Sequence, residues 1–196
     1  MGETRSLVLA SSSPYRRALL ERLGLAFIWA DPALSEMPQE GEAPGSMAVR
    51  LAVEKARVVA KKFPDAIVIG SDQVASLDGA ILRKPGTHDN ALLQLRMLSG
   101  RTAQFDTGVA VVAESSMPAR TRLVSCRVAF RNLTDRMIEA YLAREQPFDC
   151  AGSAKAEALG IALITSIESA DPTALIGLPL IALTDLLEEA GLPVLG

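Results

Sequence analysis

The sequence predicts an α/β protein in which a mixed β-sheet carries helices on both faces. One observation is that short apolar runs, of the length of buried strands, alternate with longer stretches in which apolar residues recur at helical spacing. A second is the dipeptide Asp78-Gly79, which lies between two short β-prone runs and is typical of a hairpin turn. A hairpin joins antiparallel strands, whereas strands separated by helices are usually parallel, so strands of both senses are expected.

The first part of the chain is expected to start with a strand and then to alternate with helices. The signals are proline at the first position of a helix, serine as a cap and glycine after the last turn. The expected elements are a strand at Leu7–Ala10, a helix at Pro14–Leu23, a loop at Asp31–Gly45, a helix from Ser46 to about Lys62 and a strand at Ala66–Ile69 that ends in Gly70-Ser71-Asp72.

The second part follows the same alternation, with two threonines as expected helix caps. The expected elements are the hairpin at Asp78-Gly79, a helix from Thr87 through Leu98, paired strands at Gly108–Ala113 and Leu123–Phe130 joined by the polar loop Glu114–Arg120, a helix from Thr134 to about Arg144, a strand at Ile161–Ile164 and a helix at Pro179–Ala190. No linker divides the chain, so residues 1–196 are expected to form a single domain.

The composition limits the chemistry that the protein can carry out. The chain of 196 residues is 49% hydrophobic and has one histidine, two cysteines and a formal net charge of −3. His88, Cys126 and Cys150 are too few and too scattered for a zinc site, and a Ser-His or Cys-His device would depend on His88 alone. Two cysteines argue against a disulfide scaffold and for a reducing, cytoplasmic location. The side chains that remain available for catalysis or ligand binding are therefore carboxylates, lysines and arginines.

Membranes and nucleic-acid polymers are not expected as partners. No run of about 18 apolar residues is present, as a transmembrane helix would require, and the short polar start Met1–Ser6 does not resemble a secretory signal. The acidic net charge and an aromatic content of 4% argue against binding to a nucleic-acid polymer. A small anionic ligand remains compatible, because one pocket can be basic on an acidic protein.

The segment Ser11-Ser12-Ser13-Pro14-Tyr15-Arg16-Arg17 joins the first strand to the first helix. Free backbone N–H groups and serine hydroxyls at the start of a helix can bind an anion. Arg16 and Arg17 lie where the helix dipole disfavours positive charge by about 0.3–1 kcal/mol each, which points to an anionic ligand. The alternative is a serine N-cap beside two solvated arginines.

Two carboxylates and two lysines are further candidates. Asp72 follows a buried strand, where its side chain would point into the crevice of an open sheet to bind Mg²⁺ or orient water, and Glu36 could share this task. Lys55 and Lys84 are candidates for binding phosphate, because the lysine ammonium group is a compact positive charge. Singly, each has a plainer interpretation, with Asp72 as a turn cap and the others as solvated residues. Together with the arginines they indicate a Mg²⁺-dependent phosphate site that needs no histidine and contains no ordinary P-loop.

The motifs, taken in order, resemble those of the Maf family of nucleoside triphosphate pyrophosphatases, once described as septum-formation inhibitors. They are Ala10-Ser11-Ser12-Ser13-Pro14 with Arg16-Arg17, Glu36, Lys55, Gly70-Ser71-Asp72-Gln73, Lys84-Pro85, Ser99-Gly100, Ala151-Gly152 and Gly177-Leu178-Pro179. The resemblance extends from about Leu7 to the C-terminus. It implies an elongated α/β fold related to the inosine-triphosphate pyrophosphatases, with two lobes around a nucleotide cleft, and it implies a homodimer.

The resemblance also implies a reaction and a role for each residue. Family members cleave a nucleotide between its α- and β-phosphates, release pyrophosphate and use a divalent cation, usually Mg²⁺ or Mn²⁺. By motif, Asp72 would accept the proton of the attacking water and would hold the metal together with Glu36. The residues that would hold the phosphates are Ser11, Arg16, Arg17, Lys55 and Lys84. One departure is Ser35, which stands where the family often has an aspartate before the glutamate.

Tyr15, Gln73 and Glu157 lie at positions that resemble the family's 7-methyl-GTP branch rather than its dTTP/UTP branch. An aromatic face attracts the positively charged 7-methylguanine ring by about 0.5–2 kcal/mol, and a carboxylate accepts hydrogen bonds from guanine N1–H and the 2-amino group. The plainer interpretation is a surface tyrosine and a solvated glutamate. Alternative functions are a pyrophosphatase for dTTP, UTP or modified pyrimidine nucleotides, and a nucleotide-binding regulator of septum formation. His88 is interpreted as a surface residue and Cys150 as a packing residue.

Overall fold

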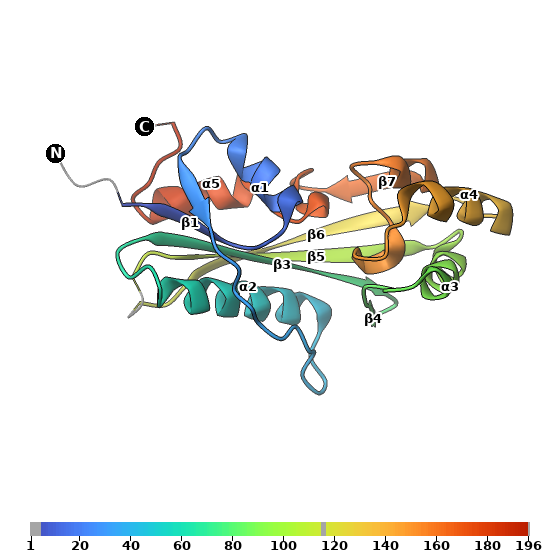
Figure 1. The fold of residues 1–196 in the computed structure, drawn as a ribbon, viewed down its shortest axis with the longest axis horizontal. Helices are drawn as coiled ribbons and strands as arrows, with labels where there is room; N and C mark the ends of the chain where they lie inside the picture. Colours follow the sequence, from blue (N-terminus) through green and yellow to red (C-terminus); the bar gives the residue numbers. More distant parts are fainter. Residues whose placement is uncertain (1–4, 115–116, 196) are drawn as a thin grey trace. The chain divides into compact units, whose positions relative to one another are not determined.

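The computed structural model describes residues 5–114 and 117–195, and within them an α/β fold of five α-helices and one mixed seven-stranded sheet (Figure 1). The strand order is β2-β1-β3-β5-β6-β7, and β4 pairs with β3 outside this path. The elements are β1 (Leu7–Ala10), α1 (Pro14–Glu21), β2 (Phe27–Trp29), α2 (Pro44–Ala60), β3 (Ile67–Leu77), β4 (Ala80–Leu82), α3 (His88–Leu98), β5 (Thr102–Val112), β6 (Arg120–Phe130), α4 (Asp135–Glu145), η1 (Ala151–Ser153), η2 (Leu159–Leu163), β7 (Ile164–Ser169), η3 (Ala174–Ile176) and α5 (Leu180–Glu189). The predicted α/β class is confirmed.

The chain forms two compact units, and each draws on distant parts of the sequence. Unit 1 comprises Met1–Gln73, Thr107–Val124 and Asp171–Gly196, and unit 2 comprises Val74–Asp106 and Ser125–Ala170. Strands β3, β5 and β6 each contribute residues to both units. Among the residues that are described, no helix is long and apolar enough to cross a membrane.

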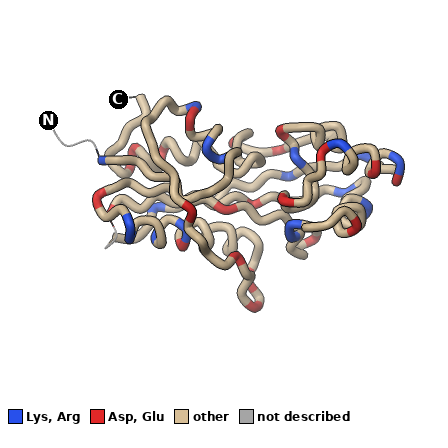
Figure 2. The backbone as a smooth tube through the Cα atoms, in the orientation of Figure 1, with Lys and Arg blue, Asp and Glu red and all other residues tan. Residues whose placement is uncertain are grey.

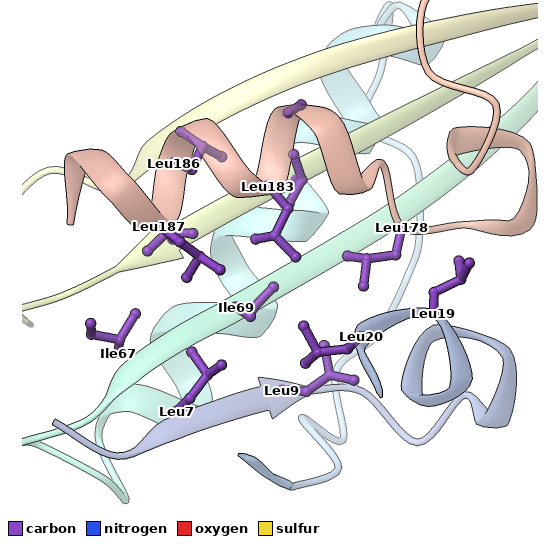
Figure 3. Packing of buried hydrophobic residues seen from close by; sticks show 13 residues of the cluster. Leu7, Leu9, Leu19, Leu20, Ile67, Ile69, Leu178, Leu183, Leu186 and Leu187 are labelled. Carbon is purple, nitrogen blue, oxygen red and sulfur yellow. The ribbon is translucent and has the colours of Figure 1, made fainter. Parts of the chain in front are cut away.

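In unit 1 the sheet is covered on both faces because every second side chain of a strand points to the same side. Strand β1 pairs in parallel with β2 and with β3. Leu7 and Leu9 pack with leucines of α1 and α5 on one face (Figure 3), whereas Val8 and Ala10 pack with alanines and a valine of α2 on the other. The expectation of helices on both faces of the sheet therefore holds for this unit.

Helix α2 packs directly against the backbone of the strands beneath it. A Cβ atom on Gly70 of β3 would lie 2.0 Å from the carbonyl oxygen of Ala52, and one on Gly108 of β5 would lie 2.4 Å from that of Ala48. Real contacts of this kind are never so short, so both positions require glycine. The small residues on both sides bring α2 unusually close to β3, and this closeness matters for the site described below.

Unit 2 contains the predicted hairpin and the two predicted threonine caps. Strands β3 and β4 pair antiparallel around Asp78 (φ 50°) and Gly79 (φ 82°), the left-handed pair that a two-residue hairpin turn requires. Thr87 caps α3 by accepting from Asn90 N, and Thr134 caps α4 by accepting from Met137 N. These predictions are confirmed because caps and tight turns depend on residues only a few positions apart.

Three local predictions are wrong. Gly70-Ser71-Asp72 does not follow a strand but lies inside β3, because its polar side chains find buried partners from other parts of the chain. Helix α2 starts at Pro44 after Ala43, so Ser46 lies in its first turn and is not its cap. Residues 161–163 belong to the 3-10 helix η2, and the strand starts only at Ile164. Of the expected start and loop, residues 1–4 and 115–116 lie outside the described residues.

Candidate active site

A buried lysine joins two carboxylates in unit 1. The Nζ atom of Lys55 donates to Glu36 Oε1 and to Asp72 Oδ1, each at 2.5 Å. The side chain of Lys55 is 5% exposed and that of Asp72 is 9% exposed, whereas that of Glu36 is 41% exposed. The cluster is thus closed at Lys55 and Asp72 and open to solvent at Glu36. The structure brings together three of the residues that the sequence predicts for the site.

The geometry of this cluster follows from the packing of α2 on the sheet. In the parallel pair of β1 and β3, Ala10 lies opposite Gly70, and β1 ends there. Asp72 therefore lies just past the carboxyl end of β1, although it is inside β3 itself. Because Gly70 lets α2 approach so closely, Lys55 of that helix reaches Asp72 with a direct hydrogen bond.

The loop that carries Glu36 is tied to α2 by one arginine. Arg50 Nε and Nη2 donate to the two carboxylate oxygens of Glu42, each at 2.6 Å, and Nη2 also donates to the carbonyl oxygen of Met37 at 3.2 Å. The Arg50 guanidinium holds the pKa of Glu42 at about 2, below the ordinary value of 4.5. This bidentate pair fixes the loop next to Glu36, so the exposed carboxylate of the cluster has a defined position.

The serine loop after β1 is held by its own hydroxyl groups. Ser13 Oγ accepts from Arg16 N at 3.4 Å and caps α1, and Ser11 Oγ accepts from Ser13 N at 3.1 Å. Ser11 is buried. The capping interpretation is therefore confirmed for Ser13, and an anion at this loop stays a prediction that the cap does not contradict. Tyr15 lies in the first turn of the helix and is half-buried.

Both arginines of this first turn have defined partners within unit 1. Arg16 Nε donates to the carbonyl oxygen of Gly177 at 2.7 Å. The guanidinium of Arg17 lies over the ring of Trp29, 4.4 Å from its centroid, which is a cation–π contact. The alternative of two merely solvated arginines is wrong. Trp29 was not among the residues predicted from the sequence, although it is the single tryptophan of a chain with few aromatic residues.

The turn that contains Gly177 accepts hydrogen bonds from several side chains of the sheet. Gly177 O also accepts from Ser71 Oγ at 2.9 Å. Gln73 Nε2 donates to the carbonyl oxygens of Ala174 at 2.9 Å and Leu175 at 3.0 Å. Gln73, expected from the resemblance to be a specificity residue, thus has its amide nitrogen bound to this turn. Gly177 has a φ of 114°, which only glycine adopts readily.

A buried aspartate shapes the same turn from its other end. Asp171 Oδ1 accepts from Thr173 N at 3.0 Å, and Asp171 Oδ2 accepts from Ile181 N at 2.7 Å. The hydrogen bond from Ile181 N satisfies an amide in the first turn of α5, where the residue at the cap position, Pro179, makes no side-chain capping hydrogen bond. Asp171-Pro172-Thr173 was not among the residues predicted from the sequence, although an aspartate two residues before a threonine, with proline between them, is a recognisable turn signal.

The remaining predicted residues belong to unit 2. Lys84 is exposed just after β4, and Glu157 is exposed in the turn between η1 and η2. Partial desolvation by its surroundings raises the pKa of the Glu157 carboxyl. A common site for Lys84, Glu157 and the residues of unit 1 stays a prediction.

Two residues without a predicted role have plain structural positions. Burial raises the pKa of the Cys150 thiol to about 12, which leaves almost no thiolate at neutral pH and agrees with a packing residue. His88 Nε2 lies 3.0 Å from Glu139 Oε2 of α4 at a half-exposed position. This half-exposed contact agrees with the interpretation of His88 as a surface residue.

The donor set of the cluster fits a divalent cation that a substrate also ligates. In the described part of the chain, no three His, Cys, Asp or Glu side chains lie together as an all-protein metal site would need. Glu36 and Asp72 both contact the ammonium group of Lys55, so the two carboxylates lie close together. Mg²⁺ is commonly held by one or two carboxylates together with water and substrate phosphates, so these two residues suffice.

Known proteins resemble this chain along nearly its whole length. A family model described as "Maf-like protein" matches residues 6–190. A Polaromonas protein named 7-methyl-GTP pyrophosphatase is 57% identical over 188 residues, covering 96% of this chain and 86% of that protein. Proteins of the same name from Cupriavidus pinatubonensis (52% identical, 95% and 94% covered) and Nitrosococcus oceani (55% identical, 97% and 96% covered) are similar along nearly their whole length.

Proposed function

Because the chain belongs to the Maf family, we propose that it is a nucleoside triphosphate pyrophosphatase that hydrolyses 7-methyl-GTP to 7-methyl-GMP and pyrophosphate. The observation that carries this proposal is the convergence of Glu36 and Asp72 on Lys55 Nζ at 2.5 Å, at the strand end where the serine loop begins. A carboxylate pair, a buried cation and a helix N-terminus are the parts that phosphoanhydride hydrolysis requires.

In the proposed reaction, Asp72 accepts a proton from the attacking water as the water oxygen bonds to the α-phosphorus. The bond between the α-phosphorus and the oxygen that bridges it to the β-phosphorus breaks, and this oxygen leaves with the electron pair as part of pyrophosphate. Lys55 holds the Asp72 carboxylate in place and offers positive charge to the phosphates. Ser11, Arg16 and Arg17 bind phosphate oxygens at the start of α1, and Lys84 contributes from unit 2.

A divalent cation, Mg²⁺ or Mn²⁺, is part of the proposal, with Glu36 and Asp72 as its protein ligands. When bound it would neutralise negative charge on the phosphate oxygens. The departure at Ser35 leaves metal binding more dependent on Asp72 and on water than in relatives with an aspartate at that position.

Base selection is proposed for Tyr15, Gln73 and Glu157. The aromatic face of Tyr15 attracts the cationic 7-methylguanine ring. The Glu157 carboxylate accepts from N1–H and the 2-amino group, a donor pair that uracil and thymine lack. Gln73 contributes indirectly, since its amide nitrogen holds the turn at Ala174 and Leu175.

The test is a screen for pyrophosphate release from 7-methyl-GTP, GTP, UTP and dTTP, each with Mg²⁺ or Mn²⁺. We expect 7-methyl-GTP to have the highest kcat/KM. The Asp72→Asn variant should be nearly inactive while it keeps its circular dichroism spectrum, and its Tm should fall because the buried Lys55 loses a charged partner. In Glu157→Gln, kcat/KM should fall far more for 7-methyl-GTP than for UTP.

Each contradictory outcome removes a separate part of the proposal. If no nucleotide releases pyrophosphate, the protein is not an enzyme of this class, and a nucleotide-binding regulator becomes the better hypothesis. An active Asp72→Asn variant excludes Asp72 as the base, and equal losses on both nucleotides in Glu157→Gln exclude base selection by Glu157.

Further features are inferred from the family alone. They are a nucleotide cleft between two lobes of an elongated fold, one Maf-like domain across residues 1–196, a homodimer and a cytoplasmic location. Sedimentation equilibrium would test the dimer, and a crystal structure with a bound nucleotide analogue would test the cleft.

A further inference from the structure

The turn around Glu157 is compact but lies outside the sheet and the α-helices. It connects η1 to η2, and Ala158 N donates to the carbonyl oxygen of Lys155 at 3.1 Å. A Cβ atom on Gly160 would lie 2.5 Å from the same oxygen, so the chain passes directly against itself and only glycine fits. Such a turn needs support from elsewhere to keep one conformation.

Helix α4 supplies this support at two points placed symmetrically about Glu157. Tyr141 Oη accepts from Lys155 N at 3.1 Å, and Glu145 Oε2 accepts from Leu159 N at 3.2 Å. The two anchored amides lie two residues before and two residues after Glu157. Tyr141 and Glu145 are four residues apart, and therefore share one face of α4.

Both anchors are themselves held in place. The side chain of Tyr141 is buried, with only 3% of the residue exposed, and burial raises the pKa of its hydroxyl, so the phenol stays neutral. Glu145 is 18% exposed at its side chain and lies 3.9 Å from Lys155 Nζ, which adds an ion pair to the hydrogen bond. The backbone on both sides of Glu157 is thus attached to a rigid helix and not only to its own turn.

We propose that Tyr141 and Glu145 are positioning residues for base selection, which hold the turn of residues 155–159 so that the Glu157 carboxylate meets the base edge in one orientation. This inference rests on the proposed function, because it assigns Glu157 the recognition of guanine N1–H and the 2-amino group. A glutamate on an unsupported turn would have to be ordered when substrate binds, and that ordering would reduce the discrimination between bases.

The Tyr141→Phe variant tests this inference, because it removes only the acceptor of Lys155 N. We expect the ratio of kcat/KM for 7-methyl-GTP to that for UTP to fall about three- to tenfold, the effect of losing one backbone hydrogen bond. The kcat/KM for UTP should stay unchanged. Glu145→Ala should act in the same direction, whereas Glu145→Gln, which keeps an acceptor oxygen, should restore most of the ratio.

A double-mutant cycle with Glu157→Gln separates positioning from general loosening. If Tyr141 acts through Glu157, adding Tyr141→Phe to Glu157→Gln lowers the ratio no further. Thr134→Val, which removes the cap of α4, is the matched control and should lower Tm without changing the ratio.

Two results would overturn the inference. One is an equal loss on both nucleotides in Tyr141→Phe, and the other is a full additional loss in the double mutant. Failure of the proposed function looks different, because the wild-type protein itself would then show no Glu157-dependent preference for 7-methyl-GTP.

Discussion

Lys55 is a buried lysine, and lysine is almost never buried in a protein unless its ammonium group has a partner. It is 4% exposed and meets two carboxylates at 2.5 Å, so its hydrogen bonds replace the water that burial removes. Without this ammonium group, Asp72 and Glu36 would face each other with like charge. The same residue therefore stabilises the fold and keeps the two carboxylates close together.

Replacing Lys55 by methionine should lower the free energy of unfolding by about 3 kcal/mol, because it leaves a buried carboxylate without its partner. Mg²⁺ should restore part of this loss in the variant, since a divalent cation can then bridge Glu36 and Asp72. Urea denaturation with and without Mg²⁺ measures both effects. Lys62→Met, at an exposed position just after α2, is the matched control and should change stability by less than about 0.5 kcal/mol. A Lys55→Met variant as stable as that control would contradict this account of the cluster.

Helix α2 acts as the element that joins the fold to the site. One face packs against glycines of β3 and β5, and from the same helix Lys55 reaches Asp72 and Arg50 holds the loop beside Glu36. The position of each carboxylate therefore depends on this helix. A substitution that changes the packing of α2 should therefore shift Glu36 and Asp72, even if the substituted residue itself does not contact a substrate.

The ion pair between Arg50 and Glu42 predicts how this part of the structure responds to acid. The folded state holds the pKa of Glu42 at about 2, below the ordinary 4.5, so the stabilisation is complete above about pH 5 and is lost as pH falls toward 2. The difference in Tm between wild type and Glu42→Gln should therefore be constant at neutral pH and should disappear near pH 2. In an Arg50→Met background the Glu42→Gln change should have no such pH dependence. A difference that stays constant down to pH 2 in the wild-type background would contradict this assignment.

At the scale of the whole molecule, an acidic protein is proposed to bind a strongly anionic substrate. Lys and Arg are interspersed with Asp and Glu along the chain (Figure 2), and the formal net charge is −3. In the proposal, attraction for phosphate therefore comes from individual cations, such as Arg16, Arg17 and Lys55, and not from an overall basic field.

Binding of a substrate analogue should stabilise the folded protein in a metal-dependent way. With Mg²⁺ and 7-methyl-GTP that carries a methylene bridge between its α- and β-phosphates, the gain should reach about 2.7 kcal/mol at a ligand concentration of 100 Kd. Differential scanning fluorimetry measures the rise in Tm, and a chelator should reduce it strongly. 7-Methylguanosine, which has no phosphates, is the control and should have little effect. Equal stabilisation with and without the chelator would exclude a metal-bridged mode of binding.

Local features of the fold were predictable because their causes lie within a few residues of each other. The helix start at Pro14, the caps Thr87 and Thr134 and the turn at Asp78-Gly79 all belong to this class. The continuation of β3 through Asp72 was not predictable in this way. Its polar residues interrupt the apolar run, and the partners that satisfy them come from residues 55, 108 and 177.

Residue types and their order were enough to predict the α/β class, the family and a set of candidate site residues. The folded structure was needed to see that Lys55 bridges Glu36 and Asp72, that Arg16 donates to Gly177 while Arg17 lies over Trp29, and that α4 anchors the turn of Glu157. Each of these contacts joins segments that are distant in the chain. They form because helices pack closely on the sheet and segments pack closely inside each unit. No local sequence pattern encodes how close that packing is.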